Sequence, residues 1–389
     1  MKKTFKDLLS LILVAVIAIV WFATPIDRFI ADAVDSRTDV AASVKQGADK
    51  KVNSTFFTDM LDERGKHTCE IIAHQLPNAP KAIFTPDIKK DELSGIFNAV
   101  SYDYPELFLI NNNCRTVYLG GICLYLQTYV LTGDEYEKQL SDVRRARDEI
   151  IRGLNLPENA SDYDKVLAVH DYLAENVDYH DKADTDYSPY GILVLKTGNC
   201  EGYSRAAQYL LNSLGVETHL VPGKAIDSTG KPQSHMWNVV KVNGHYYNMD
   251  VTFDDYLVSR KDSVTSSQDA SHTYFLVSTD TISKTHTPDK PEYNAECKYE
   301  DINYFAKNHI LFNSAADAMG SVREGVRSTI ARGRGSYEMK FATEQAFNDF
   351  IDSINNSPKI YQALRSAGSD IEGVRYTTDT NYYVIRIYF

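Results

Sequence analysis

The sequence has too little positive charge for one large class of function. Its 41 Lys and Arg stand against 53 Asp and Glu, and the net charge is −12. Binding to nucleic-acid phosphates needs clustered basic residues, and the short RGRG stretch at residues 332–335 is more typical of a polar turn between a helix and a strand. We therefore expect no nucleic-acid partner.

Repeats and low-complexity tracts are also missing from the sequence. Its 26 Tyr and 16 Phe are too many for a chain that is disordered over most of its length. With 389 residues, the chain is long enough for two or three domains with buried cores.

Cysteine is sparse, and its spacing contains no metal motif. The sequence has neither a Cys-x-x-Cys pair nor a His-x-x-x-His pair, so we expect no structural zinc site and no other metal. The cysteines are odd in number, and outside the cell four of them could form disulfides or remain buried thiols. They are Cys69, Cys114, Cys123, Cys200 and Cys297. A two-residue turn at Gly120-Gly121 would place Cys123 opposite Tyr118, which disfavours a bond between Cys123 and Cys114.

Residues 1–35 have the pattern of an export segment. Lys2, Lys3 and Lys6 precede an apolar run from Leu8 to Ala23, and such a positively charged leader is typical of a signal peptide or a membrane anchor. The run is slightly short for a spanning helix and slightly long for a cleaved signal core, so both alternatives stay open. In either case the rest of the chain is predicted to lie outside the cell, secreted or anchored at the cell surface.

The turn and helix-capping residues of the remaining chain predict an α+β fold in three parts. Residues 36–155 form an N-terminal region of helices and a β-hairpin, residues 156–295 a central domain, and residues 300–389 a small C-terminal α/β domain. In the last part Ser314 begins a helix, and the chain ends in a hairpin that turns near Asp379. We find no catalytic constellation there.

The stretch GNCEGYSRAAQYLLNSLG places Cys200 at the start of a helix. Apolar residues recur at helical spacing behind it, and Gly215 is well placed to end the helix in a left-handed turn. The unpaired N–H groups of a helix N-terminus favour a thiolate. An earlier helix, which Ser161 begins with a near capping box, bears His170 on its apolar face. We interpret His170 as a core histidine in preference to a ligand or a base.

A predicted hairpin supplies a histidine partner for Cys200. With Asn243-Gly244 as the turn, Trp237 faces Asp250, and His235 faces Thr252. His235 and Asp250 then share one face of the ribbon as diagonal neighbours, about 7–8 Å apart at the backbone, which the side chains can close to a hydrogen bond. A cysteine, a histidine and an acid can serve as nucleophile, base and orienting group. Trp237 on the same face would shield the pair from water.

The segments GNCEGYSRAAQYLL and SHMWNVVKVNGHYYNMDVTFDD resemble the transglutaminase-like superfamily of papain-like cysteine enzymes. The match is specific over about residues 160–260, with weaker similarity around residues 104–108 and 272–280, as in exported bacterial members. The resemblance implies that Cys200 is the nucleophile, His235 the base and Asp250 the third member of a triad. Other matching positions are Gly202, Trp237 and Asn238.

The resemblance implies acyl transfer through a thioester on Cys200, with an amine or water as the acceptor. The N–H of Cys200 would donate to the oxyanion, and Tyr190 is either a second donor or a packed aromatic. No cofactor is implied. We expect a cell-surface or secreted acyltransferase or hydrolase acting on proteins or peptides, cell-wall peptides among them. The alternative is a non-catalytic module that binds a protein or cell-wall partner, and an uncleaved leader would add a membrane contact.

Overall fold

The computed structural model describes residues 54–75, 83–86, 90–108, 114–119, 122–127, 133–226, 230–259, 269–369 and 373–389. The predicted export segment lies outside these residues and stays a prediction. None of the helices in the described ranges is both long and apolar enough to cross a membrane.

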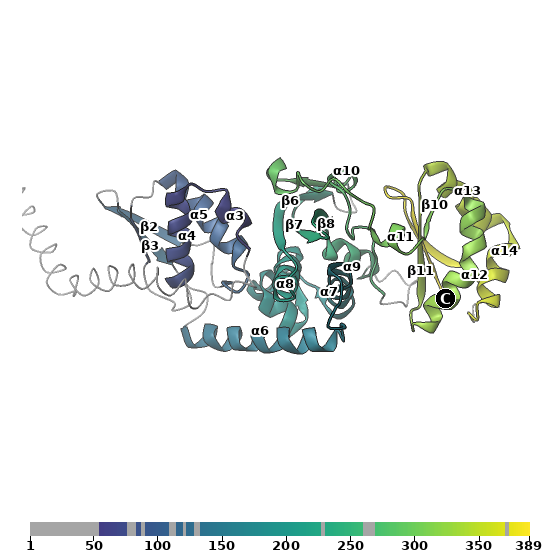
Figure 1. The fold of residues 1–389 in the computed structure, drawn as a ribbon, viewed down its shortest axis with the longest axis horizontal. Helices are drawn as coiled ribbons and strands as arrows, with labels where there is room; N and C mark the ends of the chain where they lie inside the picture. The colour runs from purple at the N-terminus through teal and green to yellow at the C-terminus, as the bar shows by residue number, and fades with distance from the viewer. Residues whose placement is uncertain are drawn as a thin grey trace, which may run out of the picture.

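Three groups of elements follow one another along the longest axis of the molecule (Figure 1). The first group packs helices beside a small antiparallel sheet of order β1-β3-β2. Its elements are α3 (Phe56–Asp59), α4 (Glu63–Gln75), β1 (Ile83–Pro86), α5 (Lys90–Asp103), β2 (Cys114–Leu119) and β3 (Ile122–Gln127). The register of β2 and β3 pairs Tyr118 with Cys123, which confirms the pairing predicted from the sequence.

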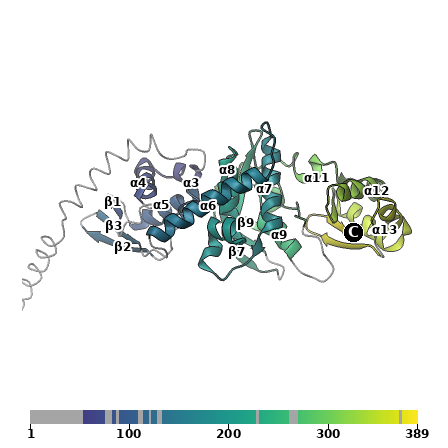
Figure 2. The same ribbon diagram turned by 90° about the horizontal axis from the view of Figure 1, so that it is seen from below.

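Helix α6 (Gly133–Gly153) connects this N-terminal group to the central one, and Figure 2 shows it lying across both. Near its start, the hydroxyl of Tyr136 donates to the carbonyl of Glu106, 3.0 Å away. Near its end, Val143 and Ile150 are buried in the core of the central group. The helix therefore holds the two groups together with one amphipathic face.

The central group is built on an antiparallel sheet of order β8-β7-β6-β9. Helix α8 packs against β7 and β6, and residues of α7, α8 and β7 share one hydrophobic core. The elements are α7 (Asp162–Asn176), β4 (Asp178–Tyr179), a 3-10 helix (Asp184–Tyr187), a π-helical turn (Gly191–Leu195), β5 (Thr197–Gly198), α8 (Cys200–Ser213), β6 (Thr218–Ile226), β7 (Pro232–Val242), β8 (His245–Met249), α9 (Val251–Ser259), α10 (Thr279–Ile282), β9 (His286–Pro288) and a second 3-10 helix (Pro291–Tyr293).

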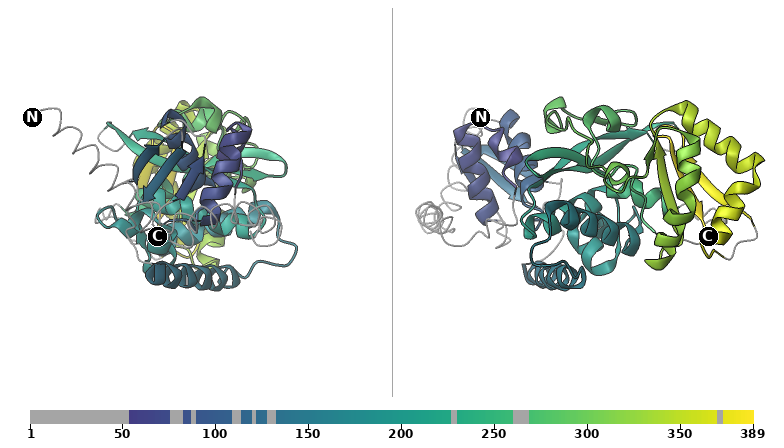
Figure 3. Two further views of the ribbon diagram at one scale, coloured as in Figure 1. Left: turned by 90° about the vertical axis from the view of Figure 1, so that its left-hand side faces the viewer. Right: turned by 45° about the vertical axis from the view of Figure 1, so that its right-hand side comes forward.

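The C-terminal group is a four-stranded sheet of order β10-β11-β13-β12 with helices on its outer side (Figures 1 and 3). Side chains of β11 alternate between the two faces. Met339 and Phe341 enter a core that these helices cover, whereas Glu338 faces the central group. The elements are α11 (Tyr304–Lys307), β10 (Leu311–Phe312), α12 (Ala315–Ala331), β11 (Ser336–Phe341), α13 (Glu344–Asn356), α14 (Pro358–Ser366), β12 (Arg375–Asp379) and β13 (Val384–Tyr388).

This mixture of helices and antiparallel sheets confirms the α+β fold class. Several local signals are also confirmed: Ser161 closes a capping box on α7, and Gly215 has a φ of 79° after α8. Helix α5 ends at Asp103, whose carboxylate accepts the N–H groups of Phe57 and Thr58 at 3.2 and 2.7 Å. This contact joins residues 45 and 46 positions apart, which no local pattern reveals. The limits drawn between the domains stay predictions.

Two glycines of α12 test how tightly this helix packs on its sheet. A Cβ on Gly325 would lie 2.3 Å from the ring of Tyr337, whereas a Cβ on Gly320 would meet nothing within 4 Å. We expect Gly325→Ala to lower the free energy of unfolding by about 1–3 kcal/mol. Gly320→Ala should raise it by about 0.5–1 kcal/mol. Calorimetry of both variants checks this, and equal effects of one sign would contradict the packing described.

Candidate active site

Cys200 is the first residue of α8, and its position is fixed by the residue before it. Asn199 caps the helix by accepting the N–H groups of Glu201 and Gly202 at 3.1 and 3.2 Å. The side-chain amide of Asn199 donates in turn to Asp181 at 2.9 Å. This cap leaves out the N–H of Cys200 itself, which therefore suits the oxyanion role inferred from the sequence. The thiol side chain is partly exposed.

Helix α8 is tied to the strand that bears the histidine. The hydroxyl of Ser204 lies 2.8 Å from the carbonyl oxygen of Cys200 and 2.9 Å from that of Met236. From β7, the buried amide of Asn238 donates to the carbonyl of Ser204 at 3.0 Å. These bonds fix the first turn of α8 against the strand segment that follows His235.

His235 and Asp250 form a buried pair. His235 Nε2 lies 2.6 Å from Asp250 Oδ2, and the exposed fractions of the two residues are 9% and 1%. The hairpin register is the predicted one, with Val242 opposite His245 and Asn238 opposite Met249.

One detail of the predicted hairpin is wrong. The ladder ends at Met249, so Asp250 does not pair with Trp237, and Thr252 lies in α9, not opposite His235. Asp250 instead accepts the first N–H groups of α9 on Oδ1, from Thr252 at 3.0 Å and Phe253 at 3.2 Å. A helix start orients the carboxylate, because the unpaired N–H groups there need an acceptor.

The charges of this pair stabilise each other. Burial alone would lower the pKa of His235, but Asp250, with a smaller contribution from Cys200, raises it to about 10. Burial opposes ionisation of Asp250, yet His235 and His286 hold its pKa below the usual range. The ring is therefore an imidazolium at neutral pH, and Cys200 is close enough to help raise its pKa.

A second layer around Asp250 was not found from the sequence. His286 Nε2 lies 2.9 Å from Asp250 Oδ2, and His286 Nδ1 lies 2.8 Å from the hydroxyl of Thr285. That hydroxyl is 2.8 Å from the hydroxyl of Tyr382, which belongs to the C-terminal group. Tyr382 follows Thr285 by 97 residues, and no motif links positions so far apart. Within the segment SKTHTP only Thr285 and His286 are buried, and the sequence alone does not mark them.

Aromatic rings enclose the pair, as expected for Trp237. This side chain is fully buried, its ring is nearly parallel to that of His235 with centroids 6.3 Å apart, and its Nε1 donates to Asn248 at 3.0 Å. The ring of Phe253 meets that of His235 edge to face, with centroids 4.8 Å apart. Water therefore has little access to the bond between His235 and Asp250.

Tyr187 and Tyr190, in the segment before α8, have different surroundings in the structure. Tyr190 packs against the hydrophobic core of the central group, the alternative that the sequence left open, and its oxyanion role stays a prediction. Tyr187 is exposed, and its hydroxyl donates at 2.9 Å to Asp181, the residue that also holds Asn199. Tyr187 is therefore linked through Asp181 to the cap of α8, a connection that the sequence did not indicate.

A cysteine at a helix start and a histidine held by an acid on an adjoining sheet define a papain-like enzyme core. Residues 153–251 match the family described as the transglutaminase-like superfamily, so this part of the chain is a transglutaminase-like core. No curated protein matches the sequence significantly.

Two solved structures match part of the chain. A provisionally assigned cysteine protease from Cytophaga hutchinsonii is 16% identical with a TM-score of 0.25, and the alignment covers 36% of this chain and 61% of that one. A protein described as a TGase is 17% identical with a TM-score of 0.26, covering 44% and 51% of the two chains. The protein described here thus spans less than two thirds of either.

Gly202 lies where α8 meets the 3-10 helix before it. A Cβ at this position would lie 2.2 Å from the carbonyl oxygen of Asp186, and the backbone cannot move without displacing Cys200. We expect Gly202→Ala to destabilise the protein by about 1–3 kcal/mol and to slow alkylation of Cys200. Gly95→Ala in α5, where a Cβ meets nothing within 4 Å, is the matched control and should do neither. Unchanged alkylation in Gly202→Ala would show that this contact does not position the thiol.

The raised pKa of His235 predicts how its contribution to stability depends on pH. Its pKa rises from 6.5 to about 10 on folding, so the contribution is complete below about pH 6.5 and is lost as the pH rises toward about 10. The difference in free energy of unfolding between wild type and His235→Gln should shrink by about 1 kcal/mol per pH unit across this interval. Urea denaturation of both proteins at several pH values measures it. A difference that grows with pH would show that the ring is neutral in the folded protein.

Proposed function

We propose that the protein is a cysteine acyltransferase or hydrolase that acts on amide bonds of proteins or peptides outside the cell. The observation that carries the proposal is the buried bond of 2.6 Å from His235 to Asp250, formed by a ring that also interacts with Cys200. Asp250 fixes the orientation of the ring and stabilises its charged form, which in turn favours the thiolate.

The chemistry follows from the positions of these groups. The sulfur of Cys200 adds to the carbonyl carbon of the substrate amide, and the N–H of Cys200 donates to the oxyanion. The C–N bond then breaks, His235 gives its proton to the departing amine or ammonia, and a thioester remains on Cys200. In the second half, His235 accepts a proton from an amine or a water molecule that attacks the thioester. Transfer and hydrolysis therefore share the first half of the reaction.

Cysteine alkylation separates an enzyme from a non-catalytic module of the same fold. Cys69 and Cys297 serve as internal controls, because both are buried, and burial raises the pKa of Cys69 to about 12 and that of Cys297 still further. In the full chain at pH 7, iodoacetamide should label Cys200 much faster than either. His235→Gln should slow this labelling by about tenfold or more, because the thiolate loses its cationic partner.

The control for this experiment lies in the same hairpin. His245 is exposed at the start of β8, and His245→Gln should leave the labelling of Cys200 unchanged. Equal, slow labelling in wild type and His235→Gln would instead indicate a surface module that binds a protein or cell-wall partner.

Product analysis then identifies the acceptor. The full chain is incubated with glutamine-containing peptides and a labelled amine, and Cys200→Ser is treated in parallel. Amine incorporation by wild type alone would mean transamidation, a gain of about one mass unit deamidation, and new termini proteolysis. If none of these products forms and Cys200 also labels slowly, the enzymatic proposal fails.

A further inference from the structure

Two buried histidines of the central group converge on one carboxylate oxygen, away from the candidate active site. His170 Nδ1 lies 3.1 Å from Asp171 Oδ1, and His272 Nε2 lies 3.0 Å from the same oxygen. One potential ligand atom from each of the three residues lies within 4.8 Å of the other two. His272 is 101 residues beyond Asp171, which is why no metal motif is visible in the sequence and why we expected no metal there.

The outer nitrogen of each ring also faces a carboxylate. His170 Nε2 lies 3.0 Å from Asp254 Oδ2, and His272 Nδ1 lies 2.7 Å from Glu338 Oε2. A neutral imidazole has a single N–H, so its other nitrogen would point a lone pair at an oxygen lone pair. Each ring therefore needs one more positive charge, on the ring, on its outer carboxylate or at the side of Asp171. Two protons could supply it, and so could one divalent cation beside Asp171.

The cluster around Asp250 provides a comparison inside the same molecule. There, too, two histidines, His235 and His286, contact one carboxylate oxygen. The outer nitrogen of His286, however, faces the hydroxyl of Thr285, which can donate to a neutral ring. Burial accordingly lowers the pKa of His286. The Asp250 cluster is thus satisfied without a further cation, whereas the Asp171 cluster is not.

The charges around Asp171 favour a cation over two buried imidazolium ions. Arg334 contacts Asp171, Glu175 and Asp269, and Arg386 contacts Glu338. These four carboxylates therefore share two guanidinium groups, and negative charge is in excess around the cluster. Two protonated rings would lie with centroids 5.3 Å apart, both nearly inaccessible to water, where like charges repel each other strongly. A single divalent ion provides the same charge without this repulsion.

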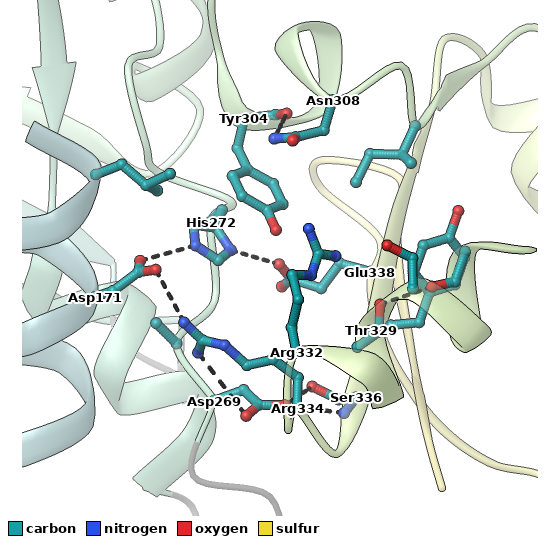
Figure 4. Close-up of a pocket in the computed structure, with 16 residues that line it drawn as sticks. Asp171, Asp269, His272, Tyr304, Asn308, Thr329, Arg332, Arg334, Ser336 and Glu338 are labelled. Carbon is teal, nitrogen blue, oxygen red and sulfur yellow. Dashed lines mark hydrogen bonds and ion pairs between the residues drawn. The ribbon is translucent and has the colours of Figure 1, made fainter. Parts of the chain in front are cut away.

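A cavity borders the cluster at Asp171 and His272. It has a volume of about 360 Å³ and is lined by Asp171 and His272 of the central group, and by Arg332, Arg334 and Glu338 of the C-terminal group. Figure 4 shows His272 between Asp171 and Glu338, at the side of this cavity. The ring of Tyr304 stacks on that of His272, with centroids 3.6 Å apart. An ion bound by the histidines could keep an open coordination position toward the cavity for water or a small anion.

We propose that His170 Nδ1, His272 Nε2 and Asp171 Oδ1 bind one divalent transition-metal ion, with zinc as the first candidate. Two imidazoles and one carboxylate are a donor set that zinc accepts. In this arrangement the N–H groups of the two rings donate to Asp254 and Glu338. A carboxylate behind each ligating histidine is the usual second layer of a metal site. The ion joins α7 to residues 269–277 and, through Glu338, to the C-terminal sheet.

Metal binding is measured on the full chain after treatment with a chelator and gel filtration. Zinc or cobalt should bind at one equivalent per chain by elemental analysis and calorimetric titration, and either ion should raise the melting temperature until chelator is added. The cobalt complex should show visible d–d bands and no thiolate charge-transfer band in the near ultraviolet. Such a band would assign the ion to cysteines and overturn the proposal.

Variants assign the bound ion to these ligands. His272→Gln should abolish tight binding, and Glu338→Gln, which keeps the three ligands, should weaken it by about 10–100-fold. His286→Gln removes a buried histidine from the other cluster and should bind the metal as wild type does, as should Cys200→Ser. The proposal is independent of the proposed catalysis, because Cys200→Ser tests only the latter.

Two results would overturn this assignment. If stripped wild type binds neither zinc, cobalt nor manganese at micromolar concentrations, and chelator leaves its melting temperature unchanged, protons satisfy the two histidines and their carboxylates in place of a metal ion. If His286→Gln loses the metal as His272→Gln does, the ion lies in the Asp250 cluster.

Discussion

The hydrogen bond between His235 and Asp250 depends on more of the chain than the two residues that form it. It requires the observed register of β7 and β8, because their pairing stops at Met249, the residue before Asp250. It also requires the start of α9, whose N–H groups hold the second carboxylate oxygen. Because the pair is buried, the attraction between ring and carboxylate is stronger than it would be in water. A shift of the strand or of the helix would leave a buried charge without its partner.

Both flanking groups support this region. Arg205 of α8 donates to Ser101, and Gln208 donates to the carbonyl of Tyr102, so the end of α5 also holds α8. On the other side, Tyr382 reaches the site through the hydroxyl of Thr285. The hydrophobic cluster that contains Trp237 includes residues from the N-terminal helices and from the C-terminal hairpin. The flanking groups are thus part of the environment of the site, although the C-terminal group also has a core of its own.

The two clusters of histidines show how similar geometry can serve different chemistry. In each, a carboxylate oxygen accepts two imidazoles at hydrogen-bond distance. The two clusters differ in the partner of the second ring nitrogen. Nδ1 of His286 faces a hydroxyl group, whereas Nδ1 of His272 faces the carboxylate of Glu338. A hydroxyl can donate or accept, so it satisfies a neutral ring, whereas a carboxylate can only accept. The outer partner therefore decides whether a cluster of this kind needs an additional positive charge.

The sequence by itself determined the elements that depend on local chemistry. Helix α8 follows from its apolar spacing and from Gly215, and the pairing of β7 with β8 follows from a turn that requires Asn243 and Gly244 at positive φ. Periodicity and turn type act over a few residues, so they can be recognised in a single chain. These local signals bring His235 near Asp250 and place Cys200 at a helix start, and the start of α9 then orients the carboxylate.

Only the tertiary structure decided which distant side chains complete each site. Asp250 meets His286 across 36 residues, and His272 meets Glu338 across 66. These contacts arise because β9 joins the sheet beside β6 and because the C-terminal sheet turns its polar face to the central group. Such packing leaves no periodic trace in the sequence, since a single buried histidine looks the same whether it fills a core or completes a site.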